Sequence, residues 1–156
     1  MVNLRMSMRE MPNTQELKDF AKKANITVAV GFLSGRQHVP KNSQSESKET
    51  AELAKELSYG TATTPARPFL EEGINSKKNE LNKVMEEQVE AVRNGKNANW
   101  DKVGTMAVGA VQEFVRGDYY KSTKPNSPET IKEKGSDTPL IDTADLLNSC
   151  EYVVEA

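Results

Sequence analysis

The stretch from Ile26 to Phe32 constrains the fold of this chain most. Large apolar side chains alternate there with small ones, which is the period of a β-strand that buries one face. It is the clearest strand pattern in the sequence, and we expect it to be central in a sheet. Two weaker alternating runs, Val2–Arg9 and Cys150–Val154, are predicted to be its neighbours.

Apolar residues at helical spacing fill much of the remaining sequence. A short helix is predicted from Asn13 to Ala24 and another from Thr50 to Leu57, the latter ending near Gly60. Two long helices are predicted at 69–94 and 100–117. We expect Trp100 to lie in the core, because it begins the apolar stripe of the last helix.

The fold class indicated by these patterns is α+β, with a small, mainly antiparallel sheet packed against two long helices. Residues 34–47 are polar and have no period, which predicts a long projecting loop that is flexible in the isolated protein. We also expect an extended loop at 120–143 and one helical turn at 144–149. At 156 residues, the chain (1–156) is consistent with a single domain.

Charge and cysteine content exclude several classes of protein. The formal net charge is −2, from 21 basic and 23 acidic residues, so the sequence lacks the basic excess of a protein that grips nucleic acid by its backbone. The single cysteine, Cys150, excludes an intramolecular disulfide and a set of thiolate metal ligands. No signal peptide or membrane-spanning run is apparent, so we expect synthesis in the cytoplasm and no membrane partner.

Two prolines define a corner ahead of the first long helix. Pro65 and Pro68 fix two backbone dihedrals and remove two amide donors, so the corner can only begin a helix or a turn. A plain helix start explains these residues. Arg67, between the prolines, could cap a helix end, pair with Glu71 one turn later, or pair across a subunit boundary.

The segment from Thr130 to Ser149 has the composition of a loop followed by a capped helical turn. Asp142 or Thr143 could cap that turn. Asp142 and Asp145 could instead face one way and serve acid-base chemistry, but capping explains them without a ligand. The one histidine, His38, lies in the polar loop with no partner suited to catalysis. We therefore expect no catalytic residues, no metal site and no cofactor.

These two segments, in this order and with the helices between them, resemble the tail-component and virion-morphogenesis proteins of tailed bacteriophages. The resemblance extends from about Ala51 to Val154. In the first segment, the residues that match the family pattern are Tyr59, Gly60, Thr61, Pro65, Arg67, Pro68 and Phe69. In the second segment they are Thr130, Pro139, Leu140, Asp142, Thr143, Leu146 and Ser149, with Ala144 where the family has glycine.

The resemblance implies a structural, non-enzymatic protein of the virion neck, for tail completion or head-tail joining. It implies a ring of identical subunits, a hexamer, that contacts the head connector or adaptor on one side and the tail terminator or tail tube on the other. DNA would only pass through the lumen. Burial of apolar anchors such as Phe69, Leu140 and Leu146 would offset the entropy lost when loops become ordered on docking.

Two alternatives remain. One is a tail terminator that caps the tube. The other is of a different class, a small hydrolase or a nucleic-acid-binding accessory protein.

Overall fold

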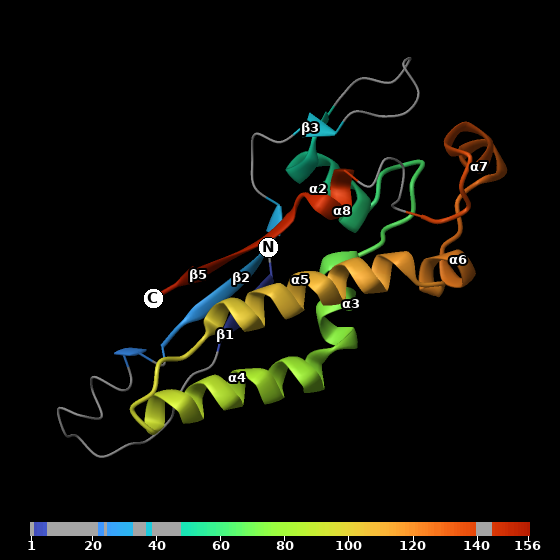
Figure 1. Cartoon of the computed structure of the whole chain (residues 1–156). Coiled ribbons are helices and arrows are strands. Elements are labelled where there is room, and N and C mark those ends of the chain that lie inside the picture. Colours follow the sequence, from blue (N-terminus) through green and yellow to red (C-terminus); the bar gives the residue numbers. More distant parts are fainter. Residues whose placement is uncertain (1, 6–21, 24, 33–36, 39–47, 140–144) are drawn as a thin grey trace.

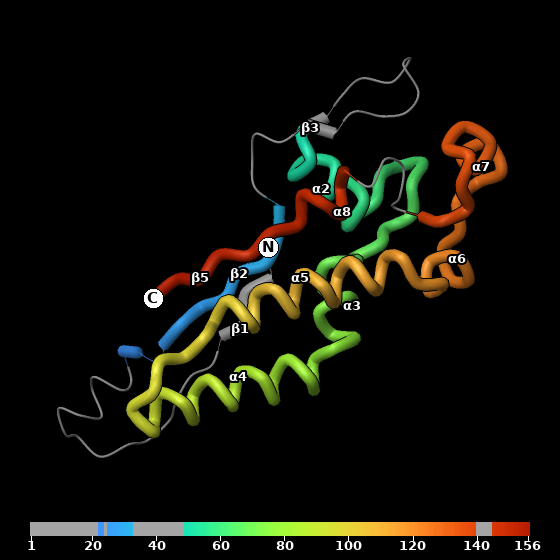
Figure 2. The backbone as a smooth tube through the Cα atoms, viewed as in Figure 1, coloured from blue at the N-terminus to red at the C-terminus, as the bar shows by residue number. Residues whose placement is uncertain are grey.

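The computed structural model describes residues 2–5, 22–23, 25–32, 37–38, 48–139 and 145–156. Within them, an antiparallel sheet lies against a layer of helices, and the predicted α+β class is confirmed (Figure 1). The two longest described helices, α4 (Lys78–Arg93) and α5 (Trp100–Arg116), run side by side (Figure 2). Helix α5 makes the most extensive contact with the sheet, and α2 (Thr50–Tyr59) and α8 (Asp145–Asn148) contact it as well.

The main sheet has three strands in the order β1 (Val2–Arg5), β2 (Thr27–Phe32) and β5 (Cys150–Glu155). Both pairings are antiparallel, so the clearest strand of the sequence is the central one, as predicted. Val28 and Val30 are fully buried, as their alternation indicated, but Ala29 and Gly31 are buried too, so β2 is covered on both faces and not on one. A separate two-stranded sheet joins β3 (Gln37–His38) to β4 (Lys48–Glu49).

The remaining described helices surround this framework. Helix α2 (Thr50–Tyr59) follows β4, and α3 (Phe69–Ser76) precedes α4. Three short helices complete the set: α6 (Tyr119–Thr123), α7 (Pro128–Lys134) and α8 (Asp145–Asn148). The predicted helical turn at 144–149 is therefore present as α8.

Two glycines allow α5 to pack closely against its neighbours. A Cβ added at Gly73 in α3 would lie 2.8 Å from the Cα of Val111, so only glycine lets α3 and α5 approach this closely. A Cβ added at Gly104 would lie 2.2 to 2.6 Å from atoms of the Tyr152 ring in β5. Gly73 thus serves helix packing.

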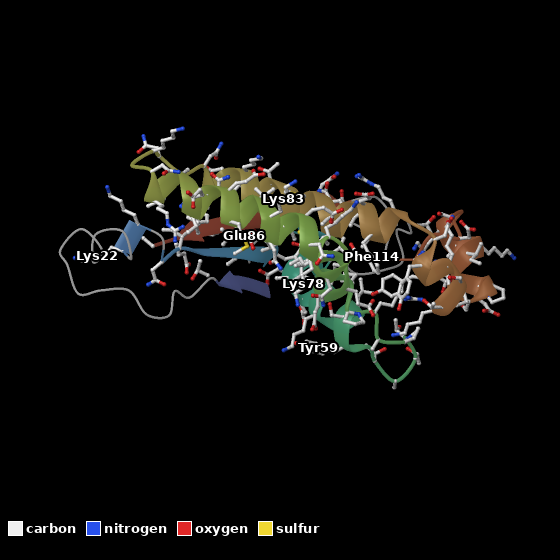
Figure 3. All side chains as sticks on the ribbon, turned by 90° about the horizontal axis from the view of Figure 1, so that it is seen from below. Lys22, Tyr59, Lys78, Lys83, Glu86 and Phe114 are labelled. Atoms are coloured by element: carbon white, nitrogen blue, oxygen red, sulfur yellow. The ribbon has the colours of Figure 1, made fainter. Side chains whose placement is uncertain are left out.

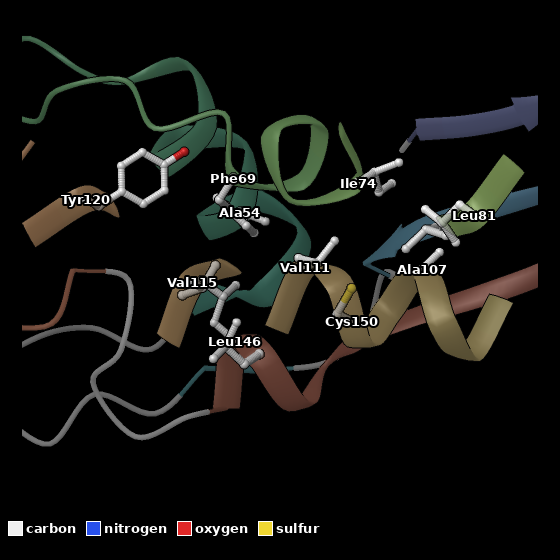
Figure 4. Packing of buried hydrophobic residues seen from close by; sticks show 12 residues of the cluster. Ala54, Phe69, Ile74, Leu81, Ala107, Val111, Val115, Tyr120, Leu146 and Cys150 are labelled. Carbon is white, nitrogen blue, oxygen red and sulfur yellow. The ribbon is translucent and has the colours of Figure 1, made fainter. Parts of the chain in front are cut away.

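The core combines residues from distant parts of the chain. Its larger cluster includes Phe69, Val111, Tyr120 and Leu146 (Figure 4). A smaller cluster joins Val28, Met85 and Val103, with Trp100 half-buried against it. Trp100 therefore lies at the margin of the core and not at its centre, because it is the first residue of α5.

The predicted single helix at 69–94 is wrong, since the chain forms two helices that break at Lys77. The Ser76 hydroxyl donates to the Gly73 carbonyl at 2.6 Å, and the Lys77 amide donates to Ile74 O at 3.2 Å. These bonds tighten the last turn of α3 before α4 begins. The apolar period continues across the break because α3 and α4 both pack on α5.

The predicted extended loop at 120–143 is also wrong where the structure describes it, because α6 and α7 occupy much of it. Local signals explain α7. Ser127 Oγ accepts a hydrogen bond from the Thr130 amide, Pro128 occupies the first turn, and Gly135 ends the helix at φ 69°.

Several predictions fall partly or wholly on residues outside the described part. One is the helix at 13–24, of which residues 22–23 are described and helical. Another is the strand at 2–9, of which residues 6–9 lie outside the described part. In the predicted loop at 34–47, Gln37–His38 form strand β3, and the remaining residues lie outside the description. Leu140, Asp142 and Thr143 lie outside it as well.

A pair of glycine substitutions tests the packing of α5. Gly73→Ala adds a methyl group against the Val111 backbone, and we expect the cost of overpacking, about 1–3 kcal/mol, to exceed the gain in helix propensity and lower the free energy of unfolding. Gly109→Ala in α5 is the matched control, because a Cβ there meets nothing within 4 Å. It should stabilise the protein by about 1 kcal/mol. Denaturant unfolding measures the free energy of unfolding of both variants. If the two substitutions changed it equally, the close contact of Gly73 with α5 would be contradicted.

Candidate functional site

The first of the two family-like segments forms a corner between α2 and α3. It begins at Gly60, which ends α2 with a φ of 77° and donates its amide to Glu56 O at 2.8 Å. A Cβ at this position would lie 2.8 Å from both Ala66 N and Thr64 O. Glycine is therefore required both by the backbone conformation and by the close return of the chain.

A compact turn follows, fixed by one side chain. The Thr61 amide donates to Thr64 O at 2.9 Å. Thr61 Oγ1 accepts from the amides of Thr63 and Thr64, at 3.4 and 3.2 Å. Thr61 and Thr63 are exposed, so this turn is held by its own hydrogen bonds at the surface.

The two prolines direct the chain back onto α2 and then into α3. The Arg67 amide donates to Leu57 O at 2.9 Å, and the Phe69 amide donates to Arg67 O at 2.7 Å across Pro68. Pro68 has φ −73° and ψ 58°, which is an inverse γ-turn. The predicted helix start is present, and Phe69, the first residue of α3, is fully buried.

Arg67 fixes the corner to a distant part of the chain. Its side chain is only 4% exposed, and its Nε and Nη2 donate to Lys124 O at 3.0 and 2.8 Å. Nη2 also donates to Pro125 O at 3.2 Å. Because Lys124 is the C-cap of α6, the guanidinium lies where the helix dipole is negative.

Of the three roles considered for Arg67, capping a helix end is therefore the one that the structure contains. Among the described residues, Arg67 has no ion pair with Glu71 or any other carboxylate. Burial lowers the pKa of Arg67, although an arginine remains charged at neutral pH. Since its donors bind buried carbonyl groups, Arg67 stabilises the corner from inside the protein and is not available at the surface.

Two further side chains join α6 to the same region. The Tyr120 hydroxyl donates to Glu72 Oε2 in α3, and Lys124 Nζ donates to Ala66 O. Burial, followed by the hydrogen bond to Glu72 and its charge, raises the pKa of Tyr120. This network was not predicted from the sequence, although the i, i+4 spacing of Tyr120 and Lys124 would have placed both on one side of a helix.

The second family-like segment is divided between surface and core. Thr130 is half-buried in α7, and Pro139 is fully buried. Leu146 and Ser149 are 3% and 7% exposed, and the Ser149 hydroxyl donates to Asp145 O at 2.6 Å. The proposed caps Asp142 and Thr143, and the anchor Leu140, remain predictions because they lie outside the described residues.

The structure brings the two segments together in one core. Phe69, Leu146 and Ala54 of α2 belong to the same buried cluster (Figure 4). Phe69 and Leu146 were expected to be anchors for docking on other subunits, but they are used inside the subunit. The docking role expected of them is therefore incorrect.

Among the residues of the first segment that match the family pattern, Tyr59, Thr61 and Pro65 are exposed. Tyr59 is 79% exposed, more than the other exposed large apolar residues, Tyr119 and Val153. In the view of Figure 3, it lies at the lower edge of the molecule, on the side away from α5. An exposed aromatic residue on a fixed corner is the kind of group that anchors a protein contact.

A groove adjoins Tyr59. Its volume is about 480 Å³, and it lies between α2 and the start of α3. The residues that line it are Phe32, Ala51, Ala54, Lys55, Ser58, Tyr59, Pro68, Leu70 and Glu71. The groove is mainly apolar, with Lys55 and Glu71 as its charged members.

Reactive and metal-binding groups do not converge in the described part of the chain. Among those residues, no group of three or more histidine, cysteine or carboxylate side chains is placed to hold a metal ion. No helix in the described ranges is long and apolar enough to cross a bilayer. Cys150 is buried, and burial raises the pKa of its thiol to about 12.

Comparison with known proteins adds no relative. No protein-family model matches the chain, no curated protein matches it, and no solved structure matches its fold. The likeness to phage tail components consequently depends on the two motifs and on the order of the elements between them.

Removing the Arg67 side chain tests whether this buried cation holds the corner. Arg67→Ala leaves the carbonyls of Lys124 and Pro125 without their donor, and hydrogen bonds from charged groups contribute about 1.5–3 kcal/mol. We expect a loss of about 2–3 kcal/mol in the free energy of unfolding and faster amide exchange in α6. Arg93→Ala is the control, because Arg93 pairs with Glu90 at the surface and should change stability by less than about 0.5 kcal/mol. Similar melting of the two variants would contradict the role given to Arg67.

Proposed function

We propose that this protein is a structural virion protein of a tailed phage, a tail-completion or head-tail joining component of the neck. It acts as a ring of identical subunits between the head connector and the tail tube. It has no catalytic step, cofactor or membrane partner in this proposal. DNA passes through the lumen and is not bound by recognition of its sequence.

The observation that carries the proposal is the display of Tyr59 and the 61–65 turn on a rigid frame. On the buried side of the turn, Arg67 contacts α6 through hydrogen bonds and Phe69 packs in the core. On the exposed side, Tyr59 is 79% exposed beside an apolar groove. The family-like residues therefore divide into a supporting set and a displayed set, which is the arrangement expected of a contact surface.

A rigid loop suits a protein that works by assembly. A loop that is already ordered loses little conformational entropy on binding, so more of the contact energy appears as affinity. Tyrosine adds a large contact area with few rotatable bonds. The Thr61 hydrogen bonds and the Gly60 conformation keep this loop in one shape before any partner is present.

Neck assembly also requires unlike faces on each subunit, because a closed ring of identical copies is built from heterologous contacts. The 59–65 turn and the Tyr59 groove supply one such face. They are formed mainly from α2, the corner and α3, and Phe32 at the end of β2 also lines the groove.

Substitution of Tyr59 tests the proposal. Tyr59→Ala should melt like the parent, since the side chain is largely exposed, but it should reduce association with neighbouring subunits or neck partners by about tenfold or more, as expected for an aromatic anchor. Tyr119→Ala is the matched control, because Tyr119 is 46% exposed and packs on Phe114 and Tyr120. The control should lose stability and retain assembly.

Native mass spectrometry and negative-stain electron microscopy would measure the outcome. The proposal expects a defined oligomer, alone or with a neck partner, with rings that have a central opening. A chain that remains monomeric with every neck component would contradict the proposal. So would turnover of a nucleic acid, peptide or glycan by the purified protein.

A further inference from the structure

A second surface of the subunit lacks a covering element in the described residues. On α5, beside the core stripe, four residues recur at helical spacing: Thr105, Val108, Gly109 and Gln112. Thr105 and Gly109 are exposed, and the other two are half-buried. With Cys150, Glu151 and Tyr152 of β5, they line a groove of about 490 Å³. The groove thus lies between α5 and strand β5.

Gly109 is unexplained by the packing within the subunit. A Cβ at Gly73 or Gly104 would collide with Val111 or Tyr152, but at Gly109 it would meet nothing within 4 Å. Glycine in the middle of a helix lowers its stability relative to alanine. A glycine with open space above it suits a surface that another backbone approaches closely.

The strand beside this groove is an end strand. In the order β1-β2-β5, the backbone of β5 pairs on one side with β2, and no other described strand pairs with its second side. A six-residue end strand offers a row of backbone donors and acceptors that can pair with a further strand. One end of such an added strand would lie beside the groove between α5 and β5.

We propose that β1 of a second copy of this chain adds to β5, so that the sheet continues from one subunit to the next. The inference rests on the proposed ring and names the surface through which it closes. Strand β1 is the other end strand of the same sheet. Each copy therefore has one edge of each kind, which makes the contact heterologous and able to close a ring.

The register of the sheet supports this choice of partner. Within one subunit, Arg5 and Glu155 both stand opposite Thr27. Likewise, Leu4 and Val154 both stand opposite Val28. Strands β1 and β5 are both antiparallel to β2, so β1 of the second copy would run parallel to β5. If it keeps the register that β1 has within the subunit, its Arg5 lies beside Glu155 and its Leu4 lies beside Val154.

Charge and polarity then agree across the contact. A basic residue meets an acidic one, and an apolar residue meets an apolar one. Opposite charges and apolar pairs on adjacent strands are both favourable. By contrast, two copies of β5 paired antiparallel about Val153 would place Glu151 opposite Glu155, which is unfavourable. The sequence of β5 thus favours β1 over a second β5.

A charge exchange tests the proposed pairing. Glu155→Lys and Arg5→Glu each place like charges across the contact, and we expect each variant to associate about tenfold more weakly than the parent. Both should melt like the parent, because within one subunit the two positions are two strand spacings apart, about 10 Å, where charges are largely screened.

Mixing the two variants gives the decisive result. Where the two variants meet, the new lysine of the Glu155→Lys variant would face the new glutamate of the Arg5→Glu variant. The other kind of mixed contact would keep the original pair, Arg5 with Glu155. An equimolar mixture should therefore assemble as the parent does, with equal numbers of the two variants in each assembly by native mass spectrometry. A mixture that assembles no better than the separate variants would overturn the pairing.

A blocked groove supplies an independent measurement. Gly109→Trp should fill the groove at the Cys150–Tyr152 end of β5, beside which Val2 of the added strand would lie, and weaken association while the melting temperature is kept. Asn82→Trp, on the exposed side of α4, is the matched control and should assemble as the parent does. Association that is unchanged by Gly109→Trp would show that the groove is not the contact.

Two outcomes separate this inference from the proposed function. Rings that form unchanged in all of these variants would overturn the strand contact and leave the neck proposal standing. A parent that is monomeric at all concentrations, with β5 amides strongly protected from hydrogen exchange, would show that a segment of the same chain fills the groove. That result would overturn the second copy as the occupant.

Discussion

The rest of the structure depends on the position of α5 between the sheet and α3. Contact on each side requires a glycine. Gly104 of α5 accepts the Tyr152 ring from β5, and Gly73 of α3 accepts the Val111 backbone. Because neither contact leaves room for a Cβ atom, the two contacts fix the distance of α5 from β5 and from α3. They thereby also determine which faces of α5 remain uncovered by these two elements. The core and the groove between α5 and β5 both depend on that position.

The sequence predicted the parts of the fold that depend on local pattern. Central strand β2, the ends of α2 at Gly60 and of α5 at Gly117, and strand β5 could all be predicted from period and capping residues. Helix α7 was missed although its signals, Ser127, Pro128 and Gly135, are equally local. The break at Lys77 could not be predicted, because the apolar period continues through it.

The site was harder to predict because its contacts are distant in sequence. Arg67 was recognised as a possible helix cap, but nothing near it indicated the carbonyls of Lys124 and Pro125 as its partners. For the same reason, Phe69 and Leu146 appeared free to anchor other subunits, whereas they pack together in one cluster. Several of these motif residues maintain the shape of the subunit, whereas Tyr59 and the 61–65 turn lie at the surface, where we propose that a partner binds.

The order in which the sheet forms also determines when a chain could associate through β5 in the proposed ring. Strands β2 and β5 are neighbours in space, but helices α2 to α8 all lie between them in the sequence. Closing so long a connection is slow compared with forming the helices, so the sheet is expected to complete late in folding. Until β5 has paired with β2, the groove along α5 does not exist. In the ring that we propose, the rate at which subunits become able to associate would be the rate of this last pairing, and partly folded chains would be kept out of the assembly without any separate check.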